Sequence, residues 1–298
     1  MKFDVILTNP PFQDTVKRNT TPHKLWIDFT LAVFDRLLKD NGILCQVSPA
    51  SFGSPSNKVL DIMKEHRTVR VRFDTGEHFP TVSSTFADYL IYKSPYDGTP
   101  TTIVESKGAW DVQLDGEVSY LPNDVGSRAL SIHRKVIFQA SDKLPLQRDY
   151  VTCHNILLRK SDTLSKTETK RHMYPVFHTN RQIWYSAVRQ PWASLKKVMW
   201  TRSGYTKPFY DSGLLGGTDM VYFVEVESEE VGLALAHNLN TRLFQYIFKT
   251  AKWSGFGNEK VFAALPQLPV GKPLSDQQMF ELFNLTTEEV EHVERTLG

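Results

Sequence analysis

The chain has 298 residues, of which 23% are charged and 41% hydrophobic, and its formal net charge is only +2. This composition is typical of a globular protein with a sizeable core, and it excludes a disordered chain. Cys45 and Cys153 are the only cysteines and match no zinc-ligand spacing, so we expect neither a disulfide framework nor a metal site. No segment is typical of a signal peptide or a membrane span, which predicts a cytoplasmic protein.

The most specific segment lies near the amino end, where a short apolar run leads into a turn that contains two prolines. Residues 5–7 are Val-Ile-Leu, which predicts a buried strand of an α/β sheet. The turn that follows consists of Asn9, Pro10, Pro11 and Phe12. Because proline has a fixed φ and no N–H, the turn is stiff and presents free carbonyl acceptors. The carboxyl ends of strands are where such sheets place their chemistry.

The residue types of this turn match an amino group on a flat ring. An exocyclic –NH2 group offers two donors, and the Asn9 side chain and the turn carbonyls supply two acceptors. Phe12 adds a flat face on which a ring can stack, so the turn predicts a pocket for a base rotated out of a duplex. The alternative interpretation is a turn that merely ends the strand, since Asn and Pro are ordinary turn residues.

The next part of the chain alternates between helical and extended patterns, as α/β units do. A helix over residues 25–42 is predicted from apolar residues at helical spacing, with Gly42 as its C-cap. The elements expected after it are a strand over 43–49, a helix over 57–66, a strand over 69–73 and a hairpin over 79–93.

Further elements are predicted in the carboxyl-terminal part. Val221 to Val224 predict a strand, and residues 231–248 predict one continuous helix. Ser275 is followed three residues later by Gln, and Thr286 by Glu, so each predicts a capping box at the start of a short helix.

The turn and the order of these segments resemble the adenine-N6 DNA methyltransferases of the TaqI and Eco57I type. In that family the Asn-Pro-Pro-aromatic turn carries catalysis. The Leu-Asn pair at 239–240, the aromatic Gly-rich loop at 253–258 and Leu265-Pro266 are similar to the family's target-recognition regions. The last two helices resemble its helical tails.

The resemblance implies a fold, a division of the chain and a reaction. The expected fold is α/β, with a partial Rossmann-like methyltransferase sheet followed by an α+β target-recognition domain. The catalytic half is expected at 1–110, the recognition domain at 111–272 and the helical tail at 273–298. The implied reaction moves a methyl group from S-adenosylmethionine to a flipped adenine, with Asn9, Pro10, Pro11 and Phe12 catalytic. Cytosine N4 offers similar chemistry, but the related turn usually carries Ser in place of Asn.

One part of the family pattern is missing from this sequence. Family members carry a Phe-x-Gly-x-Gly loop and two acidic strand ends for S-adenosylmethionine before the catalytic strand, and here only three residues precede Asp4. We therefore expect a second methyltransferase subunit to supply the cofactor-binding half. The nearest substitute within the chain is Gly255 and Gly257, with Asp276 about twenty residues later. The segment before them is helical in pattern, which disfavours it. Residues 211–217 are a weaker match and are expected to form a β-turn.

Basic residues are concentrated in the middle of the chain. Between Arg148 and Phe209 there are twelve basic residues and three acidic ones, interleaved with Trp184, Tyr185, Trp192 and Trp200. Such a stretch is suited to phosphate contacts, which predicts binding of double-stranded DNA. The alternative is a solvated basic surface with the tryptophans in the core. The expected DNA-binding residues are Arg159, Lys160, Lys170, Arg171, Arg181, Arg189, Lys196, Lys197 and Arg202.

The sequence leaves three functional classes open. The first is a catalytic and recognition portion that works with a cofactor-binding chain in a bacterial or phage restriction-modification system. A truncated chain or a misassigned start codon would look the same. The second is a catalytically inactive DNA-binding or specificity subunit. The third is an unrelated α/β binding protein, which requires the ordered segments to match by accident.

Overall fold

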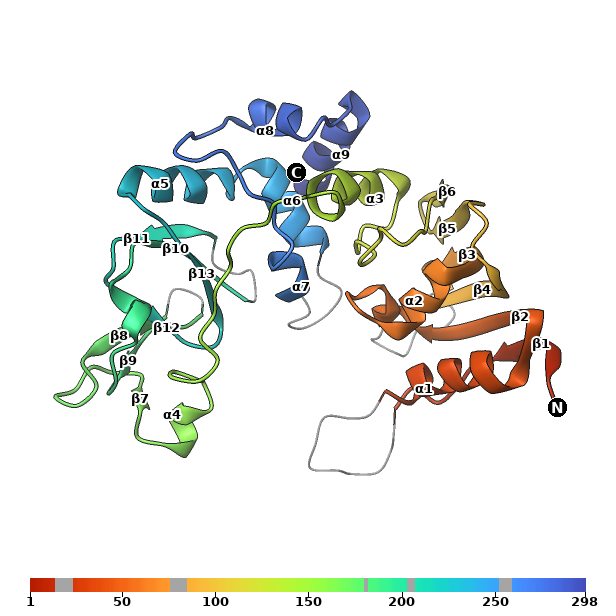
Figure 1. Ribbon diagram of the computed structural model, residues 1–298, viewed down its shortest axis with the longest axis horizontal. Helices are drawn as coiled ribbons and strands as arrows, with labels where there is room; N and C mark the ends of the chain where they lie inside the picture. Colours follow the sequence, from red (N-terminus) through yellow and green to blue (C-terminus); the bar gives the residue numbers. More distant parts are fainter. Residues whose placement is uncertain (14–23, 76–84, 180–181, 203–206, 252–258) are drawn as a thin grey trace. The chain divides into compact units, whose positions relative to one another are not determined.

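A six-stranded mixed sheet forms the centre of the first of two units. The computed structural model in Figure 1 describes residues 1–13, 24–75, 85–179, 182–202, 207–251 and 259–298. Of these, Met1–Arg134 form the first unit, and Lys135–Ala251 with 259–298 form the second. Residues 111–134, which the sequence assigned to the recognition domain, thus belong to the first unit.

The sheet of the first unit combines parallel and antiparallel pairs. Its strand order is β1-β2-β4-β3-β5-β6, with β1 parallel to β2 and β3 parallel to β5. The other neighbours are antiparallel. This mixed α/β architecture confirms the predicted fold class. The strands are β1 (Phe3–Thr8), β2 (Leu38–Pro49), β3 (His66–Arg72), β4 (Phe86–Pro95), β5 (Thr101–Glu105) and β6 (Gly108–Val112).

Helix α1 (Leu25–Ala32) covers one face of this sheet. Its buried Thr30 accepts a 2.7 Å hydrogen bond at Oγ1 from Gln46 Nε2 on β2. Alternate residues of β2 on this face, including Leu44, are fully buried, whereas Cys45 and its neighbours on the other face are only half-buried. The further helical segments of this unit are α2 (Lys58–Glu65), α3 (Ser127–His133) and the 3-10 helix η2 (Ala50–Gly53).

The predicted helix over 25–42 is wrong from Leu38 onward. Helix α1 ends at Ala32, a π-helical turn η1 (Val33–Leu37) follows, and β2 already begins at Leu38. The pairing with β1 then jumps from Phe3↔Leu38 to Val5↔Ile43, so the intervening residues bulge out of the sheet. Asn41 adopts a positive φ of 60°, a conformation that asparagine tolerates, and Gly42 is therefore not a C-cap.

The second unit holds two small sheets and most of the helices. One sheet has the order β11-β10-β13 and the other β12-β8-β9-β7. The strands are β7 (Leu164–Ser165), β8 (Tyr174–Phe177), β9 (Ile183–Ser186), β10 (Lys197–Thr201), β11 (Phe209–Asp211), β12 (Gly216–Gly217) and β13 (Val221–Glu225). The helices are η4 (Arg134–Phe138), which begins at the last residue of the first unit, α4 (Leu157–Lys160), η5 (Pro191–Ser194), α5 (Glu229–Asn238), α6 (Arg242–Thr250), α7 (Glu259–Phe262), α8 (Asp276–Leu282) and α9 (Thr287–Leu297).

The continuous helix predicted over 231–248 is divided into α5 and α6. Asn238, at the end of α5, donates to the carbonyl of Lys272 at 2.9 Å and accepts from the amide of Leu274 at 2.8 Å. Asp276 accepts a 2.7 Å hydrogen bond from the backbone N–H of Arg242 at the start of α6. Asp276 thus satisfies a backbone N–H at the start of α6 that a continuous helix would satisfy itself, and the Asn238 side chain ties the end of α5 to the 272–274 segment.

The two carboxyl-terminal helices begin as predicted. Ser275 accepts from the amide of Gln278, whose side chain bonds back to the Ser275 amide, and Thr286 and Glu289 form the same reciprocal pair. Both capping boxes are confirmed. Among the helices of the described residues, none is long and apolar enough to cross a membrane.

Candidate active site and nucleic-acid interface

The Asn-Pro-Pro-Phe turn follows β1 directly and lies at the carboxyl ends of β1 and β2. Pro10 is buried, and the Phe12 ring centroid lies 5.2 Å from that of Phe86, with the ring planes at 34°. Phe86 is the first residue of β4 and pairs with Pro49, the last residue of β2. The turn therefore packs where β2 ends and β4 begins. This is the edge of the sheet at which the sequence places the chemistry.

Packed and exposed residues alternate along the turn. Pro10 and Phe12 are anchored by packing, whereas Asn9 and Pro11 are exposed. Within the described residues no hydrogen bond engages the Asn9 side chain, so its amide oxygen is accessible to a ligand. A rigid turn with one exposed amide matches a site that accepts hydrogen bonds from an amino group.

A set of charged side chains near this edge was not identified from the sequence. Asp88 accepts a 2.7 Å hydrogen bond at Oδ2 from Thr75 Oγ1, and it lies 3.6 Å from Arg70 Nη2 and 3.9 Å from Arg72 Nε. Because Asp88 follows Phe86 by two positions in β4, both side chains lie on the same face. The alternation of side chains along β4 could be predicted from the sequence, but the pairing of Asp88 with the arginines of β3 could not.

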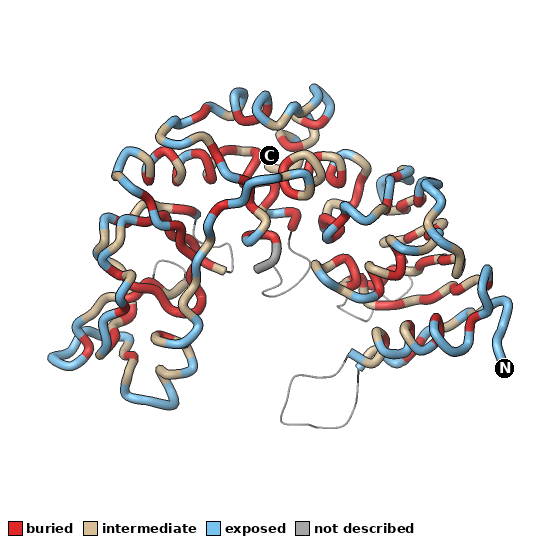
Figure 2. Tube along the Cα trace, viewed as in Figure 1, coloured by how far each residue is buried: buried red, intermediate tan, exposed pale blue. Residues whose placement is uncertain are grey.

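Strand β1 was predicted to be buried, and the structure contradicts this prediction. Phe3 is 41% exposed, Val5 60% and Leu7 80%. The trace near the N-terminus is accordingly mostly pale blue in Figure 2. Val5 pairs with Ile43 and Leu7 with Cys45, so Val5 and Leu7 lie on the face opposite to α1. β1 is also the terminal strand of the sheet, with β2 on one side.

An exposed apolar strand of this kind is unusual. Parallel strand pairs are normally covered on both faces, and long apolar edges favour pairing with another chain. Exposed Val5 and Leu7 thus form, with the half-buried Ile43 and Cys45, an apolar surface that we call the β1 surface. Contiguous exposed apolar surfaces occur at sites that bind protein, membrane or ligand.

The segments that the sequence offered as cofactor-binding candidates differ in what the structure shows of them. Gly255 and Gly257 lie outside the described residues. Asp276, their expected acidic partner, caps α6 through the Arg242 amide. Within residues 211–217 the Asp211 side chain accepts from the amide of Gly213, whose φ is 101°, so the bend rests on a side-chain hydrogen bond, and the expected β-turn stays a prediction. The described part of the chain contains no group of three or more His, Cys, Asp or Glu residues able to hold a metal ion.

Four of the expected DNA-binding residues gather at one end of the second unit. Arg159 and Lys160 are exposed at the end of α4, and Lys170 and Arg171 are exposed in a turn that returns to the same region. Arg171 forms an ion pair with Asp162, two residues after α4, which brings the two segments together. Arg159, Lys160 and Lys170 thus retain cationic groups on an exposed surface suited to phosphate.

Most of the other expected residues lie elsewhere in this unit. Arg189, after β9, and Lys196, before β10, are exposed. Arg202 is half-buried just after β10, and its amide donates to the carbonyl of Met220 at 2.8 Å. Arg181 is outside the described residues.

Lys197 does not belong to an interface with DNA. Its side chain is fully buried, and Nζ lies 2.6 Å from Asp211 Oδ2 while donating to the carbonyls of Ala193 and Leu195. Burial lowers the pKa of Lys197, and the hydrogen bond and charge of Asp211 act in the opposite direction. A lysine held in this way contributes to the core and is unavailable to phosphate.

The tryptophans of the basic segment are mainly packing residues. Trp200 is fully buried, and Trp184 is buried with its ring stacked 3.7 Å from that of His178. Trp192 stacks on Phe223 at 4.1 Å. The alternative of core packing therefore holds for Trp184 and Trp200, since buried rings cannot stack on bases.

Comparisons with known proteins give only distant similarities. No family model and no curated protein matches the chain. The type IIL restriction-modification enzyme MmeI, solved in complex with DNA, is similar over 78% of this chain and 42% of its own, at 11% identity and a TM-score of 0.43. The ATP-dependent type ISP restriction-modification enzyme LlaBIII, solved bound to DNA, is similar over 94% of this chain and 29% of its own, at 10% identity and a TM-score of 0.43.

A third structure belongs to a type I R-M system. It covers 35% of this chain and 24% of its own, at 18% identity and a TM-score of 0.28. The chain thus spans less than half the length of each of these three solved chains.

Proposed function

We propose that this chain is the catalytic and target-recognition portion of a site-specific DNA methyltransferase that acts on adenine N6. The observation that carries the proposal is the stiff turn after β1, in which Asn9 is exposed while Phe12 is fixed against Phe86. In this proposal the first unit performs catalysis and the second unit binds the target duplex.

The proposed mechanism uses the turn to hold and orient an amino group. A flipped adenine stacks on Phe12, and its amino hydrogens donate to Asn9 Oδ1 and to the Pro10 carbonyl. These two acceptors keep electron density on the nitrogen and fix its direction, so positioning and electrostatics supply most of the rate. S-adenosylmethionine, when bound, would supply the methyl group.

We further propose that a second polypeptide holds the cofactor and docks on the β1 surface. In support, β1 is parallel to β2, which favours coverage on both faces, yet Val5 and Leu7 are exposed. If the polypeptide that covers this face also pairs a parallel strand with the free edge of β1, that strand would end next to Asn9 and bring a cofactor to the turn. The described residues of this chain near the turn are then only one side of the cofactor site.

Lysines introduced at the β1 surface are expected to abolish methyl transfer without affecting folding. A Val5→Lys/Leu7→Lys double variant should keep the wild-type free energy of unfolding, because both side chains already face solvent. The same variant, tagged and isolated from the source organism, should lose its second polypeptide and its methyl transfer to DNA. Leu214→Lys, at a 72% exposed position of the second unit, is the matched control and should retain both. Full activity of the double variant would exclude docking at β1.

The exposed basic residues around α4 are expected to bind phosphate. An Arg159→Ala/Lys160→Ala variant should weaken duplex binding similarly for all sequences, and each lost phosphate contact should lower the salt slope by about one. Fluorescence anisotropy with a labelled duplex over a series of salt concentrations measures both effects. Lys107→Ala, which removes an exposed lysine from the first unit, should change neither. Equal slopes for the double variant and the wild type would place the duplex elsewhere.

A further inference from the structure

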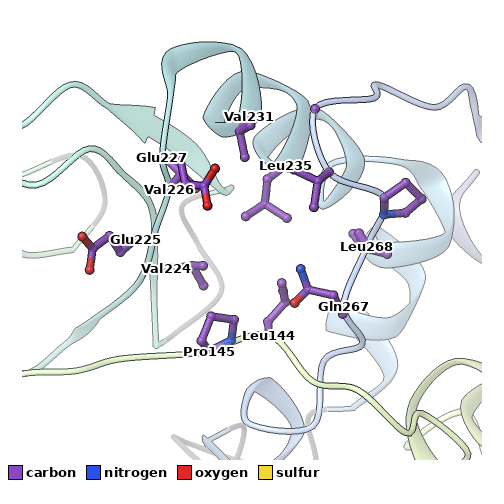
Figure 3. Close-up of a pocket in the computed structure, with 13 residues that line it drawn as sticks. Leu144, Pro145, Val224, Glu225, Val226, Glu227, Val231, Leu235, Gln267 and Leu268 are labelled. Atoms are coloured by element: carbon purple, nitrogen blue, oxygen red, sulfur yellow. The ribbon is translucent and has the colours of Figure 1, made fainter.

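A small apolar pocket in the second unit is not used by the proposed reaction. Its volume is about 150 Å³, and it lies between the end of β13, the start of α5 and residues 267–271 (Figure 3). The buried part of the wall is apolar throughout. The buried lining residues are Leu144, Val224, Val226 and Leu268.

The pocket opens to solvent rather than being sealed inside the core. Val270 lines it and is 66% exposed, and half-buried Leu235 points into it. Gln267 is exposed, and its amide is directed toward the hollow. An apolar hollow of this size accepts a group no larger than one medium side chain or a benzene ring. The amide at its edge offers a donor and an acceptor to a polar backbone.

The surroundings of the pocket are acidic. Glu227 is exposed at its edge, and Glu225, whose side chain points away from the hollow, is a further exposed lining residue. Glu229 and Glu230 follow at the start of α5, and none of these four glutamates has an ion pair within the described structure. Lys143 and Lys272 adjoin lining residues in the sequence, and the carbonyl of exposed Lys196 accepts from the amide of Val226. Four glutamates against these three lysines leave the local charge negative.

We propose that this pocket binds one apolar side chain of a basic protein segment, a leucine or a residue of similar size flanked by lysine or arginine. The volume and the apolar wall select the anchor, and charge complementarity with the glutamates selects the basic flanks. Nucleic acid is disfavoured as the occupant because its phosphates would be repelled. The Gln267 amide is placed to hydrogen-bond the backbone of the bound segment.

Methyl NMR on the full chain, labelled at leucine and valine, tests the proposed binding. The probe is the capped peptide Arg-Lys-Leu-Lys-Arg, and the matched probes replace its leucine by serine or its four basic residues by glutamate. The leucine peptide should shift the methyl signals of Leu144, Val226, Leu235 and Val270 at millimolar concentration, and both matched peptides should bind at least about tenfold more weakly. Equal shifts with the serine peptide would overturn the proposal, because they would indicate charge attraction alone.

Variants at exposed positions locate the site without disturbing the core. Glu227→Lys and Val270→Lys should each reduce binding of the leucine peptide at least about fivefold, whereas Glu291→Lys, an exposed acid on α9, should leave it unchanged. Unchanged binding by Glu227→Lys and Val270→Lys would contradict the proposal, as would absence of any shift. None of these outcomes depends on methylation, so the proposed function stands or fails separately.

Discussion

Asn9→Ala is expected to lower methyl transfer by at least about 100-fold, since removal of one preorganised transition-state hydrogen bond has an effect of this size. The loss should appear in kcat rather than in duplex affinity, which should stay within about twofold because the basic surface of the second unit is intact. Folding should be unaffected, since the Asn9 side chain is exposed. The complex isolated from the source organism, assayed with labelled S-adenosylmethionine and its own DNA, provides the measurement.

The control for this variant is Gln13→Ala, which truncates an exposed amide next to the turn. It should retain wild-type activity, because Gln13 lies beyond the ring that holds the base. A fully active Asn9→Ala complex would remove Asn9 from the mechanism. Loss of activity in both variants would instead indicate that the segment is needed only for structure.

Lys197→Ala is expected to destabilise the second unit by about 3–5 kcal/mol, the usual result of leaving one partner of a buried ion pair uncompensated. The partner left behind is Asp211, whose Oδ2 lies 2.6 Å from Lys197 Nζ. Lys196→Ala is the matched control at the neighbouring position. Because Lys196 is exposed, its removal should change the free energy of unfolding by no more than about 0.5 kcal/mol. Urea unfolding of the full chain compares the two variants.

A double variant separates the buried charge from the packing of the lysine stem. Lys197→Met keeps most of the volume, and Asp211→Asn removes the remaining charge while keeping an acceptor for the Gly213 amide. The pair should therefore recover much of the stability that Lys197→Met loses alone. Equal effects of Lys197→Ala and Lys196→Ala would show that the ion pair contributes nothing measurable.

The same two lysines illustrate what the sequence could and could not predict. Lys196 and Lys197 are adjacent and chemically identical, and both were assigned to the DNA surface. They differ because Lys197 is the first residue of β10 and pairs with Asp211 on β11, whereas Lys196 precedes the strand and is exposed. Charge counting along the chain contains no information about such a pairing.

Local patterns predicted the elements near the turn well. The apolar run before Asn9 forms β1, the strand predicted over 43–49 lies within β2, and the helix predicted over 57–66 is present as α2. The burial of β1 was predicted wrongly for a different reason. Three apolar residues in a row predict a strand, but they do not show which of its faces the rest of the chain covers, and here the face of Val5 and Leu7 is left exposed.

The break between α5 and α6 could not be predicted from local sequence patterns either. Apolar periodicity runs through residues 231–248 without interruption, yet α5 ends at Asn238. The cause is the 272–276 segment, which bonds Asn238 and the Arg242 amide from more than thirty positions away. Long-range polar contacts of this kind override helical propensity.

The central claim is best tested by mapping modified bases in the source genome. Single-molecule sequencing of the wild-type strain, of a strain lacking this gene, and of that strain complemented with wild type or Asn9→Ala reports methylation at every adenine and cytosine. Our account predicts that one N6-methyladenine motif disappears on deletion and returns only with the wild-type gene. Persistence of every N6-methyladenine motif in the deletion strain, with the protein confirmed in the parent, would contradict it.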